Sequence, residues 1–343
     1  MSKPSVQRLG RPGAARSLAL GAGLVALLVV VLASLAIGSR PVPPDVVLAA
    51  LLGHDVPVGD QRAVVELRVP RTVIGLVVGI GLGVSGALIQ AVTRNPLADP
   101  GILGVTAGSS FFVALGVVVL GLSSPDQYVW LALAGALVAT VAVALVGGSG
   151  RASVDPVRLT LAGVALTAVL AGIVSGLRIA DPRTFNALLV WETGSLVDRG
   201  WQMAGPVLPF VAVGLVIALL LGGSLNALAL GDDVATALGS TVWVTRIAAI
   251  LAVTLLAGGA TAIVGPISFI GLMVPHVARW IACPDQRWII ALTVLLAPVL
   301  LLTADILARV VLWPGEMPVG IVTAFVGAPV LIWLVRRQKA FAL

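Results

Sequence analysis

Apolar stretches about as long as a membrane is thick recur along nearly the whole of this 343-residue chain. Hydrophobic residues make up 59% of it and charged residues only 10%, whereas soluble domains carry roughly 25% charged residues. The chain therefore has too little polar surface to cover a water-soluble globule, and ~20 apolar residues suffice for one membrane-spanning helix. We predict an all-α polytopic membrane protein with about ten transmembrane helices. These lie at about 18–38, 71–91, 98–120, 128–147, 159–178, 203–222, 244–264, 267–282, 288–308 and 319–335.

The distribution of Lys and Arg predicts how these helices are oriented. An even number of spans places both termini on one side, and both ends of the chain are basic, so we expect both termini to be cytoplasmic. This orientation divides the chain into a tail at 1–17, one transmembrane domain at 18–338 with a cytoplasmic loop at about 223–243, and a tail at 339–343. The run 18–38 is too long for the apolar core of a signal peptide and lacks a good cleavage site, so it counts as a retained helix.

Thirteen of the 21 Lys and Arg residues fall on the inner side in this arrangement, and eight arginines face outward. The outward residues are Arg40, Arg62, Arg68, Arg71, Arg178, Arg183, Arg199 and Arg309. Arg68 and Arg71 flank Pro70 at the start of the second span, where proline suits the first helical turn. Arg309 lies one turn after Asp305, which predicts an i,i+4 ion pair. Arginines at span ends commonly extend toward the interface, but two guanidinium groups can also bind carboxylates of an external partner.

The predicted inner loop contains a short amphipathic helix. Asp232 or Asp233 can cap its start, Val234, Ala235 and Leu238 share one face, and Gly239 can end it. Such a helix can lie on the membrane surface, but surface helices are usually basic at their polar face. The acidic start therefore favours docking into a groove on a cytoplasmic partner.

Two further segments are marked by turn residues. Asn95-Pro96 and Asp99-Pro100-Gly101 predict an elbow between the second and third spans, although a plain turn would look the same. Gly265-Pro266 and Pro275 interrupt the eighth span, which is tolerated where protein or a cavity satisfies the freed backbone groups. His276 lies beside Arg279 at the inner end of that span, where a structural role is favoured over proton transfer.

Several classes of function are excluded or disfavoured by what the sequence lacks. The one cysteine, Cys283, cannot form an intramolecular disulfide, and the two histidines lie too far apart in sequence to suggest a metal cluster. No P-loop of the GxxxxGK[ST] type is present, so the chain is not an ATPase by itself. We therefore predict no enzyme activity of its own, no cofactor and no metal site. The net charge of +6 reflects cytoplasmic loops beside a lipid bilayer rather than nucleic-acid binding.

Together these segments, from about Leu67 to Arg337, resemble the FecCD family of permeases, which serve ABC importers of iron–siderophores, haem and vitamin B12. The resemblance implies ten transmembrane helices per subunit and a dimer with an identical or paralogous second permease subunit. It also implies two cytoplasmic ATPase subunits and an extracytoplasmic substrate-binding protein. Iron–siderophore is the commonest cargo of the family, with haem and cobalamin as alternatives, and the inner or plasma membrane is the implied location.

The resemblance also assigns roles to particular positions. Arg68, Arg71 and Arg309 match arginines that dock the binding protein. The ATPase-coupling segment is matched by Leu230, Gly231, Asp232, Asp233, Ala235, Leu238 and Gly239. A cytoplasmic gate is matched by Asp155, Pro156 and Val157, of which the last two depart from the small hydroxyl residues of some members. Glu192 also departs from the family pattern, since a hydrophobic residue is usual there.

Two other classes of membrane protein fit the hydrophobic pattern less well. A secondary transporter driven by an ion gradient usually places ionisable groups at mid-membrane, and the predicted spans have none there. A receptor or a channel without energy coupling is a third possibility. The absence of any long soluble segment in the sequence disfavours a receptor.

Overall fold

A computed structural model describes residues 12–39, 41–148, 156–282 and 284–339. Within these ranges the chain is almost wholly helical and has no β-strand. The elements are α1 (Pro12–Ala36), α2 (Pro44–Leu51), α3 (Val58–Gln61), η1 (Arg62–Arg68), α4 (Val69–Thr93), η2 (Pro100–Leu103), α5 (Val105–Leu120), α6 (Pro125–Gly148), α7 (Pro156–Ala180), α8 (Pro182–Glu192), α9 (Trp201–Ala204), α10 (Leu208–Ala229), α11 (Asp232–Ala237), α12 (Val242–Val253), η3 (Thr254–Gly258), α13 (Gly259–Val264), α14 (Ile270–Ala282), α15 (Gln286–Val311) and α16 (Val319–Lys339).

Each of the ten predicted spans is occupied by a helix. Seven helices are long and apolar enough to cross a membrane, α5 and α16 are shorter apolar helices, and α14 fills the remaining position with 13 residues. Two boundaries differ from the prediction. The third span becomes helical only at Val105, because Gly104 adopts a left-handed conformation (φ 76°) between η2 and α5. The sixth begins at Leu208, since Gly205-Pro206 separates it from the short α9.

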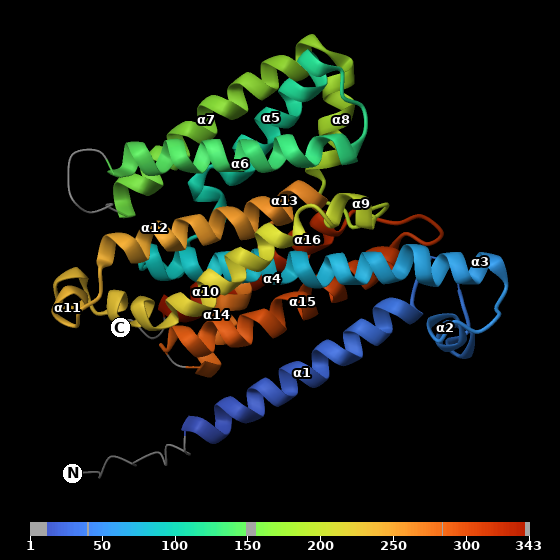
Figure 1. Ribbon diagram of the computed structural model, residues 1–343, viewed down its shortest axis with the longest axis horizontal. Helices are drawn as coiled ribbons and strands as arrows, with labels where there is room; N and C mark the ends of the chain where they lie inside the picture. The colour runs from blue at the N-terminus through green and yellow to red at the C-terminus, as the bar shows by residue number, and fades with distance from the viewer. Residues whose placement is uncertain (1–11, 40, 149–155, 283, 340–343) are drawn as a thin grey trace.

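The long helices lie side by side, with α4 and the continuous helix α12–η3–α13 at the centre (Figure 1). Burial confirms this arrangement, because 78% of the most apolar window of each central helix is buried, against 11% for α1 and 17% for α7. Close packing depends on small residues. A Cβ atom on Gly86 of α4 would lie 1.8 Å from the carbonyl oxygen of Gly271 in α14, so only glycine fits there.

The two ends of the bundle carry different short elements. The start of α1 and the short helix α11 share one end, called the inner end below because the sequence predicts it to be cytoplasmic (Figure 1). The other end carries α2 and α3 and is called the outer end. The cytoplasmic location of the inner end stays a prediction.

Candidate functional site

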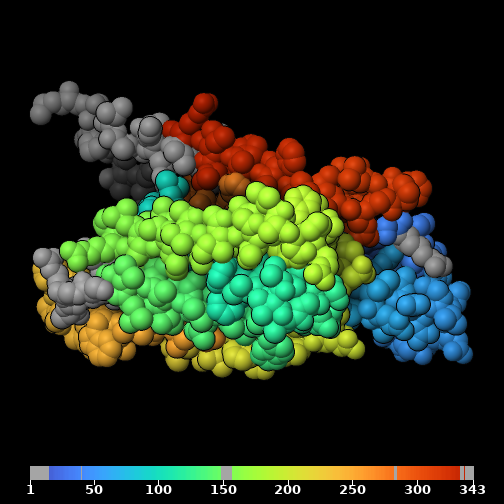
Figure 2. Space-filling view, turned by 90° about the horizontal axis from the view of Figure 1, so that it is seen from above, coloured from blue at the N-terminus to red at the C-terminus, as the bar shows by residue number. Residues whose placement is uncertain are grey.

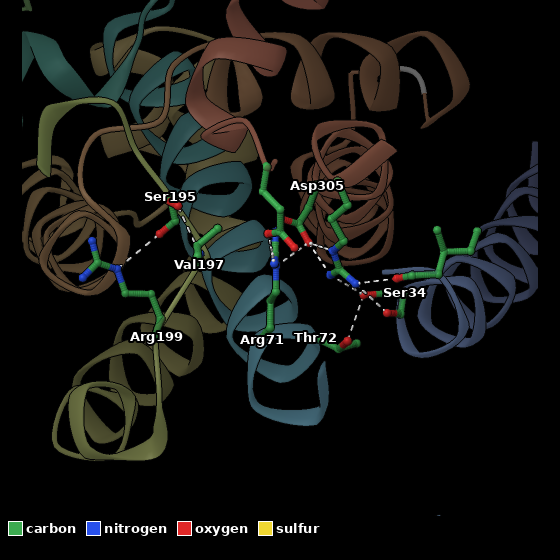
Figure 3. A network of polar contacts seen from close by, with 10 residues as sticks. Ser34, Arg71, Thr72, Ser195, Val197, Arg199 and Asp305 are labelled. Carbon is green, nitrogen blue, oxygen red and sulfur yellow. Dashed lines mark hydrogen bonds and ion pairs between the residues drawn. The ribbon is translucent and has the colours of Figure 1, made fainter. Parts of the chain in front are cut away.

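Of the three predicted docking arginines, Arg71 and Arg309 share the carboxylate of Asp305 at the outer end, and Figure 3 shows Asp305 beside Arg71. The third, Arg68, lies in η1 just before α4. Arg71 donates from Nε and Nη2 to Asp305 at 3.0 and 2.8 Å, and from Nη1 to Glu316 at 2.6 Å. Arg309 donates from Nε to Oδ2 of Asp305 at 3.0 Å, the same oxygen that accepts from Arg71 Nε. The predicted i,i+4 pair between Asp305 and Arg309 is therefore present, with both side chains only 1% exposed.

Arg309 and Arg68 also bind the end of α1. Arg309 Nη1 donates to the carbonyl oxygens of Ser34 and Ile37 at 2.7 and 2.8 Å. Arg68 Nη1 donates to those of Leu35 and Ala36 at 2.9 and 2.8 Å. The last carbonyls of a helix lack partners within the helix and carry partial negative charge, so cations stabilise them. The cluster thus fastens α1, otherwise largely exposed, to α4 and α15.

This geometry changes the interpretation of the predicted docking residues. Arg68 is 5% and Arg309 is 1% exposed, so their guanidinium groups are buried in the described conformation, and their role in docking stays a prediction. Their donors are used within the chain, because buried cations need carboxylates and carbonyls close by. Burial raises the pKa of Glu316, but the hydrogen bond and charge of Arg71, with a further bond from Ser39, bring it below the ordinary value.

A cavity of about 360 Å³ lies beside this cluster, and it includes an arginine that the sequence analysis did not single out. Its charged lining residues are Arg68, Arg71, Arg199 and Arg309 with Glu66, Asp198 and Glu316. Arg199 makes no ion pair within the described part of the chain. Its Nε donates to the carbonyl of Ser195 at 3.3 Å (Figure 3), and burial lowers its pKa despite the nearby charge of Asp198. Arg199 is only 6% exposed, but no carboxylate binds it within the described part of the chain, which makes it a candidate partner for an added carboxylate.

At the inner end, the loop after α10 forms the predicted short helix, α11. Gly239 ends it with φ 79°, while the amides of Gly239 and Ser240 donate to the carbonyls of Thr236 and Ala235 at 2.9 Å each, a Schellman motif. The start differs from the prediction: Gly231 is the N-cap residue, and no side chain caps the helix. Neither Asp232 nor Asp233 performs that role.

Asp232 instead joins α11 to two transmembrane helices. Its carboxylate pairs with Arg246 of α12, at 3.0 Å for each of two contacts, and with Arg94 at the end of α4. Arg94 is left-handed (φ 51°, ψ 29°), and its Nε also donates to the Leu228 carbonyl at the end of α10 at 2.9 Å. Two guanidinium groups outcompete the helix amides for the carboxylate, because charge-assisted hydrogen bonds are about twice as strong as neutral ones.

The two faces of α11 are clearly separated. Ala235 is fully buried against the bundle, whereas Leu230, Val234 and Leu238 are 64%, 45% and 64% exposed. Val234 and Leu238 are four residues apart and lie on one side of α11, and Leu230 comes just before the helix. Ala235, which the sequence analysis grouped with Val234 and Leu238, lies on the opposite face. The exposed apolar stripe at the inner end is the kind of surface that a partner's groove covers.

The predicted gate falls at the start of α7. Asp155 lies outside the described residues, Pro156 is the first residue of α7, and Val157 is 66% exposed. No described contact tests whether this segment closes a path.

A second and larger cavity, of about 710 Å³, opens on one side of the bundle. Figure 2 shows that side, with α16 in red beside α7 and α8 in yellow-green. The cavity is lined by α5, α7, the end of α8, the segment before α14 and the first turns of α16. Its charged residues are Arg178 and Glu192, which form an ion pair. We call it the lateral cavity.

The break before α14 is reinforced from α4. Gln90 donates to the carbonyls of Gly271 and Leu272 at 3.3 and 3.2 Å, and accepts from Arg279 at 3.0 Å. His276 is 3% exposed and packs edge-on against Trp280 at 5.2 Å between ring centroids. These contacts satisfy freed backbone groups at the interruption, as the sequence pattern required.

A helical bundle of this arrangement, with a short amphipathic helix at one end and a cavity open along its side, matches that of an ABC transporter permease. A solved structure described as an inward-facing conformation of an ABC transporter assigned to the metal-chelate type matches with a TM-score of 0.81. The two sequences are 27% identical, and the match covers 93% of this chain and 98% of the chain in that structure. The model of the FecCD transport family matches residues 26–337. The chain belongs to that family.

Relatives of known assignment agree with this membership. The ferric enterobactin transport system permease protein FepD of Escherichia coli (strain K12) is 49% identical over 96% of this chain and 98% of its own. The iron(3+)-hydroxamate import system permease protein FhuB of Bacillus subtilis (strain 168) is 36% identical over 93% of this chain and 83% of its own.

Proposed function

We propose that this chain forms the membrane path of an ATP-driven importer for ferric chelates, of which siderophores are the first expectation. It would work with a second permease subunit, two cytoplasmic ATPase subunits and an extracytoplasmic binding protein, and would catalyse no reaction itself. Family membership supports the permease role, and the relatives named for ferric enterobactin and iron(3+)-hydroxamate import support the cargo class.

The observation that carries the proposal is the attachment of α11. Its exposed apolar stripe at the inner end suits a groove on an ATPase subunit, and its buried face is joined through Asp232 to α4 and α12. Movement of an ATPase subunit would therefore reach the two most buried helices of the bundle. This is a physical route by which ATP binding outside the membrane can change the conformation of the path within it.

At the outer end, the cavity with four arginines supports docking of an acidic partner. Arg68, Arg71 and Arg309 would contribute mainly positive potential, since their donors are already used, and Arg199 would receive the carboxylate directly. This keeps the proposed docking surface at the predicted arginines but moves its principal contact to Arg199. The gate at Asp155, Pro156 and Val157 remains a proposal resting on the family resemblance.

A pair of matched variants tests the inner surface. Leu238 and Leu52 are each 64% exposed, but at opposite ends of the bundle. Leu238→Glu should abolish co-purification of the ATPase subunit, because it places a charge in an apolar contact, whereas Leu52→Glu should leave it intact. Equal co-purification with both variants would remove α11 from the interface. A wild-type chain that binds no ATPase subunit would overturn the proposed function itself.

A further inference from the structure

We propose that Arg178 is a transit contact for anionic, oxygen-rich chelates in the lateral cavity, with Glu192 as its counter-ion when the cavity is empty. The inference rests on the proposed function and adds a residue pair that selects cargo by charge within the membrane path. The inference follows from the residues that line the cavity, the unpaired donor of Arg178 and the ion pair that Arg178 forms with Glu192.

The wall that α7 contributes to the cavity is a polar stripe in a membrane helix. Thr167, Ala171, Ser175 and Arg178 all line the cavity, and their spacings of four, four and three residues place them on one helical face. Elsewhere α7 presents exposed apolar side chains such as Val164 and Ile173. Polar groups inside a membrane are costly and usually face a water-filled cavity or a transport path. The stripe therefore indicates a solvated path rather than a lipid-facing surface.

Other elements add hydroxyl groups to the same cavity. Thr106 and Ser110 come from α5, Thr193 follows α8, and Ser268 precedes α14. None of these groups carries a formal charge, so the electrostatic character of the cavity depends on Arg178 and Glu192. Neutral hydroxyl groups can bind many oxygen-rich ligands weakly, which suits a transport path from which the ligand must also dissociate.

Arg178 has hydrogen-bonding capacity to spare. Its guanidinium group pairs through Nη2 with Glu192, and both side chains are only partly exposed, at 29% and 30%. The Nε atom is buried and has no hydrogen-bond acceptor among the residues that the structure describes. Arginine has five N–H donors in a planar fork that matches carboxylate-like oxygen pairs. A rotation of the side chain toward an arriving ligand with adjacent anionic oxygens would therefore give this unpaired donor an acceptor.

Glu192 explains why such a contact would not trap the ligand. A lone guanidinium group in a partly desolvated cavity would bind an anion strongly, since charge attraction rises as the effective dielectric constant falls. With Glu192 beside it, an anionic ligand must compete with the resident carboxylate. Binding and release then exchange one ion pair for another, so Arg178 keeps an anionic partner throughout. The displaced Glu192 side chain is 30% exposed and can be hydrated within the cavity.

The test measures chelate binding to the assembled permease–ATPase complex in nanodiscs without the binding protein, by quenching of tryptophan fluorescence. The probes are a ferric tris-catecholate, which is anionic, and a ferric tris-hydroxamate, which is neutral. Arg178→Gln should weaken binding of the anionic probe about tenfold, the scale of a lost charge-assisted hydrogen bond, and leave the neutral probe unchanged. Glu192→Gln should strengthen binding of the anionic probe, because the competing carboxylate is gone.

Two further variants separate this role from a structural one. Arg178→Lys keeps the positive charge and should keep the preference for the anionic probe. Arg183→Gln is the matched control, because Arg183 is 80% exposed, pairs with Asp181 and does not line the cavity. Equal changes for both probes in Arg178→Gln, or weaker anionic binding in Glu192→Gln, would refute the inference. If the wild-type complex imports ferric chelate but these variants leave chelate binding unchanged, only this inference fails. If the wild-type complex imports no ferric chelate, the result counts against the proposed function.

Discussion

Replacing Asp305 by alanine should destabilise the outer end far more than the loss of an ordinary ion pair. The Asp305 carboxylate is 1% exposed and serves both Arg71 and Arg309. Removing one partner of a buried ion pair costs about 3–5 kcal/mol, because the other charge stays buried and unpaired. Glu316 still pairs with Arg71, so the loss falls mainly on Arg309 and the lower figure, about 3 kcal/mol, applies.

Thermal unfolding in nanodiscs, followed by the fluorescence of the eight tryptophans, measures this loss. Proteins of 150–250 residues shift by about 2–4 °C per kcal/mol, and this longer chain belongs at the lower end of that scale. We therefore expect the Tm of Asp305→Ala to fall by roughly 6 °C.

The chain offers a matched control at the same end of the bundle. Arg62 and Glu66 also form an i,i+4 pair, at 3.3 Å, but their side chains are 73% and 66% exposed. Exposed helical pairs contribute about 0.3–0.5 kcal/mol, so Glu66→Ala should change Tm by about 1 °C. A double variant, Asp305→Leu with Arg309→Leu, should recover part of the single-variant loss, since it leaves no unpaired charge. Equal Tm shifts for Asp305→Ala and Glu66→Ala would refute the buried-cluster argument.

Three further predictions follow from particular contacts. Asp232→Asn should uncouple ATP hydrolysis from transport in the reconstituted complex, because it weakens the attachment of α11 to α4 and α12. The change Asp233→Asn at the exposed neighbouring residue should leave coupling intact. Equal coupling in both variants would refute the role of Asp232 in transmitting movement. Glu316 has a lowered pKa, so its stabilising contribution is present above its ordinary value of 4.5 and lost as pH falls through the lowered value. The Tm difference between wild type and Glu316→Gln should accordingly be largest near neutral pH and vanish in acid, and a constant difference would contradict this. Gly86→Ala should prevent folding, measured as the yield of monodisperse protein, because the added Cβ would meet a backbone oxygen; Gly176→Ala, with nothing within 4 Å of its Cβ, should be neutral.

The helices were largely predictable from sequence because hydrophobic length alone specifies a membrane span. All ten predicted ranges contain a helix. The differences occur where backbone chemistry overrides hydrophobicity, as at Gly104, which delays the start of α5 to Val105. Hydrophobic windows carry no information about a left-handed residue inside an apolar run.

The roles of the arginines were predictable only in part. The pair of Asp305 with Arg309 follows from i,i+4 spacing, but the pair of Asp305 with Arg71 joins residues 234 positions apart. Long-range ion pairs leave no local pattern in one sequence. The sequence therefore places these arginines near span ends without showing that Arg68 and Arg309 are buried and bind carbonyls at the end of α1.

Asp232 illustrates competition between two sound local rules. An aspartate at the start of a short helix is a good capping candidate, yet its carboxylate pairs with Arg94 and Arg246, which come from other helices. By contrast, the polar stripe that ends at Arg178 has helical spacing along α7 and could have been read from sequence as a cavity-facing surface.

Uptake by the reconstituted complex tests the central claim most directly. The wild-type chain, with its second permease subunit and the ATPase subunits, is placed in liposomes and supplied with binding protein and radiolabelled ferric chelate. The account predicts accumulation only when ATP is available to the ATPase subunits and the binding protein is present, with no dependence on an imposed proton or sodium gradient. Accumulation driven by an ion gradient without ATP would contradict it and identify the chain as a secondary transporter.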